Sequence, residues 1–263
     1  MRMLKRITFA ALLLGIFGGG FAATSSVPLA RADVDVRDTK RLQRGARVFM
    51  NYCSGCHSLK YLRYQRMGRD LGLTTFDGRP DNDLLKNNLI FTSARVNDPI
   101  RISMPPTDAR QWFGVVPPDL SLVVRRRSAD WVYTYLNSFY ADSTRPFGTN
   151  NLLVPNVAMP NVFAPLRGRV IHVPESVTEA DTRHAHLVRV GEGSMTPEQF
   201  EDTLDDLVSF LAYVAEPVQL VRYRTGVGAL IFLGLFFLVV RALKKDIHKR
   251  ILSAQKQETD TPR

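Results

Sequence analysis

Cysteine is scarce in this chain: Cys53 and Cys56 are the only two among 263 residues. Because a structural zinc site needs four ligands, the chain has no further cysteine to complete a four-cysteine or three-cysteine zinc set. No internal repeat is apparent, so nothing points to a repeat architecture. With 45% hydrophobic residues, the chain is long enough to bury the core of one soluble domain and to carry targeting segments as well.

Acidic residues are absent from residues 1–32, which carry four basic ones, and residues 241–263 hold seven basic against three acidic groups. These two ends account for most of the formal net charge of +10, because residues 33–240 contain 24 basic and 22 acidic residues. Nucleic-acid binding requires a strongly basic surface. The near-neutral central region therefore gives no reason to expect a nucleic acid as partner.

The first 32 residues have the pattern of a secretory signal. A basic start, MRMLKR, precedes the apolar run ITFAALLLGIFGGGFAA, and Ala30-Arg31-Ala32 matches the small-x-small cleavage pattern. We predict a signal peptide over 1–32 that is removed after Ala32. The alternative, an uncleaved N-terminal anchor, is disfavoured by the three glycines at 18–20, which weaken a membrane-spanning helix.

A second apolar run lies near the C-terminus. Residues 225–240 carry no charge but would span only about 24 Å as a helix, less than a hydrocarbon core of about 30 Å. Residues 220–243 reach about 36 Å and carry arginines near both ends, whose charged groups can extend to the interface. Since basic residues are denser after this anchor than before it, the positive-inside rule places 244–263 in the cytoplasm and 33–219 outside.

Helical periodicity marks the start of the central region. Leu42, Ala46, Phe49 and Cys53 share one helical face, which predicts an amphipathic helix leading into the cysteine pair. The other predicted elements are loops broken by short helices over 71–127, a helix over 129–139, a short hairpin within 170–190, and a helix that begins at Thr196-Pro197 and ends or kinks at Pro217.

The two cysteines lie in the motif Cys53-Ser54-Gly55-Cys56-His57. A C-x-x-C pair alone fits zinc, a thiol–disulfide redox pair or haem attachment, and a redox pair is expected near a strand–helix–strand pattern rather than after a helix. The adjoining His57 decides the interpretation, because two thiols can form thioethers to the haem vinyl groups while the imidazole becomes the proximal iron ligand. We therefore predict one covalently attached haem c, which the secretory signal supports independently.

The residues leave the sixth iron ligand open. The candidates are His172, His184, His186, His248, Met50, Met67, Met104, Met159 and Met195. Three observations argue against some of these residues as iron ligands. His248 falls in the predicted cytoplasmic tail, and His184 and His186 alternate on a polar stretch typical of exposed histidines. Met195 precedes a helix N-cap, where a packing contact is the commoner role of such a residue. Met104 and Met159 both precede proline in irregular loops, and spacing alone does not separate them.

Several longer segments carry a resemblance to known proteins. In chain order they are RGARVFMNYCSGCHSLKYLRY, WFGVVPPDLSLVVRRR, DWVYTYLNSFYADSTRPFGTNN, NVAMPN and MTPEQFEDTLDDLVSFLAYVAEPVQLVRYRTG. Together they resemble the cytochrome c1 family, the haem subunits of cytochrome bc1 complexes, over nearly the whole mature chain. A lone CxxCH is common to many families, whereas PPDLS, the AEP ahead of the anchor, and their order make the resemblance specific.

The resemblance implies a mainly helical fold: a class I cytochrome c-like haem domain with long loop insertions, followed by one C-terminal transmembrane helix. It places the thioether cysteines on Cys53 and Cys56, the proximal ligand on His57, the axial methionine on Met159 and a propionate-binding arginine on Arg125. The loop ahead of the axial methionine has the shorter length of the bacterial form.

For function, the resemblance implies the electron-transfer subunit of a quinol–cytochrome c oxidoreductase in a bacterial cytoplasmic membrane. Its haem c would take single electrons from a Rieske iron–sulfur partner, in a complex with cytochrome b, and pass them to a cytochrome c acceptor; a dimeric complex is implied by the resemblance alone. A His/Met pair leaves no open coordination site, so electron transfer rather than oxygen chemistry is expected. Two alternatives are an anchored cytochrome that serves an oxidase or reductase outside a bc1 complex, and a haem sensor with a labile sixth ligand.

An acidic run precedes the anchor. Between Arg189 and Arg222 the chain has no Lys or Arg and seven acids: Glu192, Glu198, Glu201, Asp202, Asp205, Asp206 and Glu216. One hypothesis is that part of this run attracts a basic electron acceptor. The plainer interpretation is that these acids favour a helix N-terminus and a solvated helix face.

Overall fold

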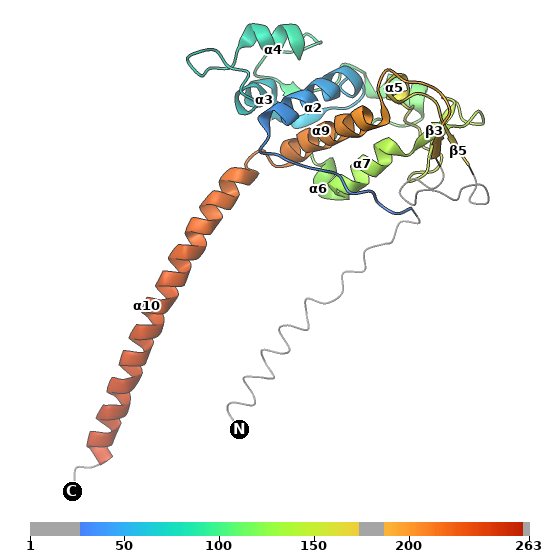
Figure 1. The fold of residues 1–263 in the computed structure, drawn as a ribbon. Coiled ribbons are helices and arrows are strands. Elements are labelled where there is room, and N and C mark those ends of the chain that lie inside the picture. The colour runs from blue at the N-terminus through green and yellow to red at the C-terminus, as the bar shows by residue number, and fades with distance from the viewer. Residues whose placement is uncertain (1–26, 174–186, 260–263) are drawn as a thin grey trace. The chain divides into compact units, whose positions relative to one another are not determined.

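The computed structural model describes residues 27–173 and 187–259, and this described part is mainly helical (Figure 1). It divides into two compact units, each described here by itself. Of the described residues, 33–129 and 198–259 form one, called the α2–α9 unit, and 27–32, 130–173 and 187–197 form the other, called the α7 unit. The haem domain expected over 33–219 is thus built from parts of two units.

The α2–α9 unit holds most of the helices. They are α2 (Thr39–Tyr52), α3 (Tyr64–Asp70), α4 (Asn82–Asn88), α5 (Pro106–Phe113), α6 (Val123–Arg127), α9 (Pro197–Ala215) and α10 (Gln219–Thr259). Strands β1 (Leu59–Arg63) and β2 (Pro99–Ile100) pair antiparallel with a shift in register between Leu59 and Arg63. Short helices joined by irregular segments occupy 71–127, as the frequency of Gly, Pro, Asn and Asp there predicts.

Helix α2 forms where the periodicity predicts it. The Asp38 carboxylate accepts hydrogen bonds from the backbone N–H groups of Lys40 and Arg41, so it satisfies donors that have no partner within the helix. The buried residues of the helix are Leu42, Gly45, Ala46, Val48, Phe49 and Met50. Cys53, the C-cap residue, continues this buried face and carries it into the motif.

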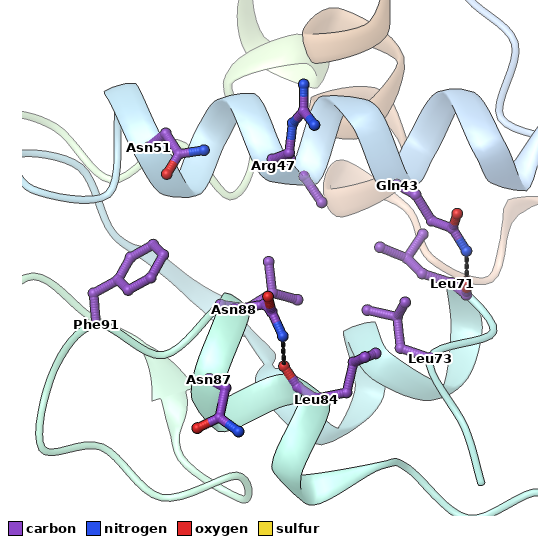
Figure 2. Close-up of a pocket in the computed structure, with 11 residues that line it drawn as sticks. Gln43, Arg47, Asn51, Leu71, Leu73, Leu84, Asn87, Asn88 and Phe91 are labelled. Atoms are coloured by element: carbon purple, nitrogen blue, oxygen red, sulfur yellow. Dashed lines mark hydrogen bonds between the residues drawn. The ribbon is translucent and has the colours of Figure 1, made fainter.

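The opposite, exposed side of α2 borders a pocket of about 500 Å³ (Figure 2). Gln43, Arg47 and Asn51, one turn apart on α2, form one wall, and residues of α4 with the segment around Leu71 form the other. The Gln43 side-chain amide donates to the Leu71 carbonyl oxygen at 2.7 Å. Neither cysteine nor His57 lines this pocket, so it is separate from the candidate haem site.

Helix α9 begins at Pro197, the residue that the sequence placed at the first helical position. Its fully buried side chains include Phe200, Leu204, Leu207 and Leu211, each at most 2% exposed. Their removal from water is a main source of the unit's stability, at roughly 1.5–3 kcal/mol for each side chain. The helix ends at Ala215, and Pro217 separates it from α10, as predicted.

Helices α2 and α9 lie side by side and come very close at Gly45 (Figure 1). A Cβ atom at Gly45 would lie 2.0 Å from the carbonyl oxygen of Asp206 and 2.7 Å from the Cβ of Phe210. Next to this contact, the rings of Phe49 and Phe210 pack with centroids 5.9 Å apart, and both side chains are fully buried. Glycine is required at this position because there is no space for any side chain.

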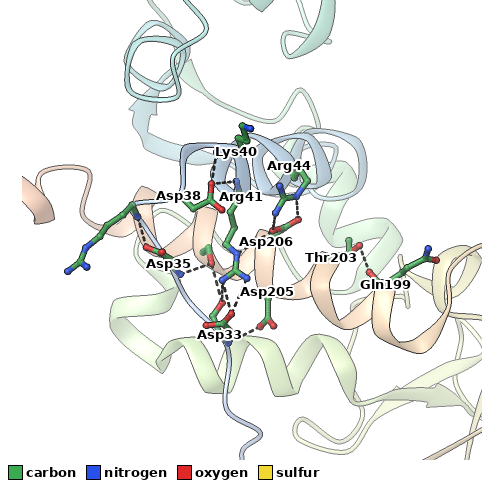
Figure 3. A network of polar contacts seen from close by, with 12 residues as sticks. Asp33, Asp35, Asp38, Lys40, Arg41, Arg44, Gln199, Thr203, Asp205 and Asp206 are labelled. Atoms are coloured by element: carbon green, nitrogen blue, oxygen red, sulfur yellow. Dashed lines mark hydrogen bonds and ion pairs between the residues drawn. The ribbon is translucent and has the colours of Figure 1, made fainter.

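A polar network covers the same crossing (Figure 3). Arg44 donates from Nε and Nη2 to the two carboxylate oxygens of Asp206, at 2.6 and 2.8 Å, and Arg41 Nε lies 3.6 Å from that carboxylate. Asp206 is only 7% exposed, so loss of its arginine partners would leave a buried charge unpaired, which costs about 3–5 kcal/mol. The network therefore adds to the apolar contact in fixing how α2 lies on α9.

The α7 unit combines two helices with two antiparallel strand pairs. The helices are α7 (Ala129–Asn137) and α8 (Ala164–Arg167), and the strands are β3 (Phe139–Ala141) with β4 (Thr149–Asn151) and β5 (Val170–His172) with β6 (Leu187–Arg189). Helix α7 and the β5–β6 pair are the helix and the hairpin that the sequence predicted. Residues 174–186, which join β5 to β6, lie outside the described part.

Helix α10 is long and apolar enough to cross a membrane over Gln219–Ser253. The most apolar stretch of 18 residues in this helix has no part buried within the structure, which favours a membrane anchor over a core helix. The sequence predicted an anchor over 220–243 and a tail over 244–263, whereas the helix continues without a break to Thr259. The residues after the anchor include Ala, Leu, Lys and Gln, which are good helix formers.

We predict that Gly45→Ala lowers the free energy of unfolding by about 3 kcal/mol, because the new Cβ forces α2 away from α9. Gly55→Ala is the matched control, since a Cβ there would meet nothing within 4 Å. Chemical denaturation of the two variants beside the parent protein measures both effects. Equal stability of all three proteins would contradict a close helix contact at Gly45.

Candidate functional site

The motif of Cys53, Cys56 and His57 forms a tight turn at the C-terminal end of α2. The backbone N–H groups of Cys56 and His57 both donate to the carbonyl oxygen of Cys53, at 3.0 and 2.8 Å. Cys53 is buried, and the other two side chains are half-buried. The turn therefore places two thiols and one imidazole together at the end of a helix whose direction is fixed by the α2–α9 contact.

Both thiols have surroundings that keep them protonated. Burial, with a smaller contribution from Cys56, raises the pKa of Cys53 to about 12, and burial also raises the pKa of Cys56. A redox-active C-x-x-C pair depends instead on a lowered thiol pKa. Among residues 27–173 and 187–259, no three His, Cys, Asp or Glu side chains are arranged to hold a metal ion. The raised thiol pKa values argue against a redox pair, and covalent haem attachment stays the prediction for these two cysteines.

His57 is oriented by one backbone carbonyl. Its Nδ1 lies 2.8 Å from the carbonyl oxygen of Pro118, which can only accept, so Nδ1 carries the hydrogen of this bond. Burial lowers the pKa of His57, against the opposing effects of Pro118 and Asp119, and favours the neutral ring. A neutral imidazole that donates from Nδ1 presents Nε2 as a ligand atom, which is what an axial iron ligand needs.

The segment 117–121, which supplies that carbonyl, is anchored to the chain just after His57. The Asp119 carboxylate accepts from the backbone N–H groups of Lys60 and Ser121, at 2.9 and 3.0 Å. The Ser121 hydroxyl is fully buried and accepts from a further backbone N–H group, at 3.2 Å. These bonds give the PPDLS pattern a physical role, because they fix the carbonyl that orients the imidazole.

The other candidate iron ligands have varied surroundings. Met50 and Met67 are buried in the core of the α2–α9 unit, where they pack against apolar neighbours, and Met104 is half-buried in the same unit. His172 is exposed, with its ring centroid 5.3 Å from that of Tyr140. Met195 lies two residues before α9, and His248 lies in α10. His184 and His186 lie outside the described residues.

Met159 belongs to the α7 unit, in the loop between β4 and α8. Two asparagines at the end of β4 shape this loop. Asn151 Oδ1 accepts from two successive backbone N–H groups, both at 3.0 Å, and Asn150 Oδ1 accepts from the N–H of Asn156 at 2.8 Å. The sequence analysis did not assign these asparagines a role, although side chains that bond to nearby backbone are typical of Asn in loops.

Tyr135 on α7 contacts the Met159 side chain, with its hydroxyl oxygen 3.3 Å from the sulfur. The ring of Trp131 stacks on that of Tyr135, with centroids 5.2 Å apart and an angle of 6° between the planes. Burial raises the pKa of Tyr135 above its ordinary value, so the hydroxyl keeps its hydrogen and remains a donor. The sequence analysis did not single out Tyr135, because the contact joins residues 24 apart in the chain.

Arg125, in α6, is 60% exposed, and its guanidinium lies 3.3 Å from the Glu216 carboxylate. Glu216 also accepts two hydrogen bonds from Arg222, at 2.5 and 3.1 Å, and this interaction lowers the pKa of Glu216. A guanidinium has five N–H donors, so one carboxylate partner leaves capacity for a second. The pair thus links α6 to the junction of α9 and α10.

The acidic run does not form one exposed surface. Asp206 is buried against Arg44, and Glu216 is paired with two arginines. Asp205 is half-buried and accepts from the Asp33 N–H at 3.0 Å, and burial raises its pKa to about 6. The steering hypothesis therefore applies at most to the exposed members, which are Glu192, Glu198, Glu201 and Asp202.

These features together describe one class of protein, a c-type haem domain carried on a single membrane anchor. The profile of the Cytochrome C1 family matches residues 32–251 of the chain. The chain belongs to the cytochrome c1 family, which confirms the resemblance and the predicted fold class.

Two curated relatives and one solved chain match the sequence over most of their length. A cytochrome c1 from Allochromatium vinosum is 44% identical over 250 residues, which cover 94% of this chain and 100% of the relative. A protein from Nitrosomonas europaea named ammonia monooxygenase gamma subunit is 38% identical over 255 residues and has the same coverage of 94% and 100%. A solved chain described as hyperthermophilic respiratory Complex III is 17% identical, with a TM-score of 0.44 and coverage of 94% of this chain and 98% of that chain.

We predict that Asp119→Ala frees the Pro118 carbonyl from its fixed position and leaves the N–H groups of Lys60 and Ser121 without their partner. The free energy of unfolding should fall by about 2 kcal/mol. Asp202→Ala, which removes an exposed acid of α9, is the control. Chemical denaturation measures the stability, and the Soret and visible spectra report the proximal ligand. Identical behaviour of the two variants would contradict a structural role for the PPDLS aspartate.

Proposed function

We propose that this chain is the electron-transfer subunit of a quinol–cytochrome c oxidoreductase of the bc1 type, with one haem c bound through Cys53 and Cys56. The observation that carries the proposal is the His57 imidazole, which follows the two thiols within one turn and donates from Nδ1 to the Pro118 carbonyl. This arrangement leaves Nε2 for iron, and the two protonated thiols suit thioether formation. The bound haem supplies one-electron redox chemistry.

The sixth ligand is Met159 in this proposal. The support comes from family membership and from the loop itself, whose asparagine bonds hold the chain ahead of Met159 in a fixed conformation. If Met159 and His57 hold the haem iron, their thioether and imidazole would favour the ferrous state, raise the potential and leave no free position for substrate. The role of the protein groups is therefore to orient the ligands, exclude water and set the potential.

Arg125 is the proposed partner of a haem propionate. Its guanidinium already pairs with the Glu216 carboxylate, and its remaining donors suit a second carboxylate. A cation beside a propionate stabilises the ionised form of that group. The pair between Glu216 and Arg222 at the start of α10 would then tie the anchor to the same region of the haem domain.

The proposed partners and location follow from family membership. Electrons come from a Rieske iron–sulfur protein and leave to a cytochrome c, within a dimeric complex that contains cytochrome b. Residues 33–219 lie in the periplasm and α10 crosses the bacterial cytoplasmic membrane once, with residues 244–263 in the cytoplasm. The basic residues after the anchor support this orientation.

Purification from the native membrane tests the assignment to a bc1 complex. A tagged chain extracted in mild detergent should bring a b-type cytochrome and an iron–sulfur protein in equal amounts, seen by mass spectrometry and reduced-minus-oxidised spectra. The competing function is an anchored cytochrome outside such a complex, and the name of the Nitrosomonas relative makes a monooxygenase one specific form of it. Recovery of the chain alone, with a terminal oxidase or with monooxygenase subunits would replace the proposal by this alternative.

We predict that Met159→Leu keeps the covalent haem but lowers the midpoint potential and allows the ferrous iron to bind carbon monoxide, because the thioether ligand is lost. The absorbance band that reports charge transfer between iron and thioether should disappear. Met104→Leu, the same change in the other proline-flanked loop, is the control and should alter none of these properties. The opposite pattern would assign the ligand to Met104.

A further inference from the structure

We propose that the Tyr135 hydroxyl raises the redox potential of the haem by donating a hydrogen bond to the sulfur of Met159. The inference rests on the proposed role of Met159 as the sixth iron ligand. The contact itself lies within the α7 unit, where the hydroxyl oxygen is 3.3 Å from the sulfur. Neither the family nor the relatives' names assign Tyr135 a role.

Two aromatic rings and one buried asparagine hold Tyr135 in position. Trp131 stacks on one face of the ring, and Phe139 meets it edge-on, with centroids 5.3 Å apart and an angle of 73°. The backbone carbonyl of Tyr135 accepts from the side-chain amide of Asn151 at 2.8 Å. Asn151 is fully buried, and its Oδ1 holds the first turn of the loop that leads to Met159. One asparagine thus fixes both the helix that carries the hydroxyl and the loop that carries the sulfur.

The chemistry follows from the two lone pairs of a thioether. One is available to iron, and the other can accept the Tyr135 hydrogen, although sulfur is a weak acceptor. A hydrogen bond draws electron density from the sulfur and makes it a poorer donor to iron. Ferric iron depends more on that donation than ferrous iron, so the oxidised state is destabilised and the potential rises. No bond is broken and no proton is transferred.

Tyr135→Phe tests the inference, because it removes the hydroxyl and keeps the ring that packs on Trp131 and Phe139. The midpoint potential should fall by at most about 59 mV, which for one electron corresponds to about a tenfold change in the reduction equilibrium constant. The iron–thioether absorbance band should remain, and thermal unfolding should stay close to that of the parent. Tyr140→Phe, the same change on a ring that packs on His172, is the control and should leave the potential unchanged.

A ring-fluorinated tyrosine at position 135 is the second variant. Its hydroxyl is a stronger donor, so the potential should move upward, opposite to the effect of Tyr135→Phe. An unchanged potential in Tyr135→Phe, with the thioether band intact, overturns this inference and leaves the ligand assignment standing. If the iron–thioether band persists in Met159→Leu, Met159 is not the iron ligand, and both the ligand assignment and this inference are overturned.

A separate observation concerns the N-terminus. Residues 27–32 lie against α7 in the same unit: the Ala30 N–H donates to the Thr134 hydroxyl and the Ala32 N–H to the Asp130 carboxylate, both at 2.9 Å. Thr134 is 4% exposed and Ala32 is 9% exposed, while Ala30 and Asp130 are half-buried, so these contacts are partly shielded from water. A cut after Ala32 would remove both bonds and uncover this side of the helix. We infer that signal peptidase cuts upstream of Val27, so that the mature protein keeps residues 27–32.

The sequence offers such a site, because Gly20-Phe21-Ala22 also has the small-x-small pattern. Mass spectrometry of the N-terminal peptide, taken from the haem protein purified from its native membrane, decides between the two positions. A mature chain that has been cut at Val27 or upstream of it supports the inference, whereas an uncut chain that begins at Met1 overturns it. A first residue at Pro28 or later, with Asp33 as the specific alternative, overturns it. This result is independent of the haem ligands.

Discussion

The close approach of α2 and α9 at Gly45 determines where the turn of Cys53, Cys56 and His57 lies. Gly45 meets the backbone of Asp206, and Phe49 and Phe210 pack beside it, so α2 has one position on α9. Protein interiors are packed too densely for such a contact to shift without displacing its neighbours. Because Cys53 continues the buried face of the same helix, the position of the motif follows directly from this contact.

The orientation of the His57 imidazole depends on a second constraint, the position of one carbonyl group. Proline has a fixed φ, so the backbone of Pro117-Pro118 has little freedom, and the Asp119 carboxylate ties the segment to the residues after the motif. The imidazole then has one tautomer and one orientation.

Charged groups have a different role in the molecule. Arg44 with Asp206, and Glu216 with Arg125 and Arg222, join helices rather than present a surface to a partner.

Asn151 has a corresponding role in the α7 unit. It connects α7 to the loop that carries Met159, and it is fully buried, so the relation between Tyr135 and the sulfur does not depend on exposed, mobile groups. Two aromatic rings, one stacked and one edge-on, limit the Tyr135 side chain further. A redox protein that exchanges only electrons benefits from such rigidity, because a fixed ligand geometry keeps the potential constant.

The sequence by itself determined the features that depend on neighbouring residues. Periodicity predicted α2 and its buried face, the Thr196-Pro197 pattern predicted the start of α9, Pro217 predicted its end, and the uncharged run predicted α10. The motif Cys53 to His57 predicted the cofactor for the same reason, since its ligand groups are adjacent in the chain.

The tertiary structure decided the contacts between distant segments. The His57 acceptor is 61 residues away and the Asp206 partner of Arg44 is 162 residues away. No local pattern contains these contacts, because the free energy that forms them comes from burying surfaces that meet only in the folded chain. The sequence therefore predicted a solvated helix face for Asp206, and only the tertiary structure shows that its carboxylate is buried against Arg44.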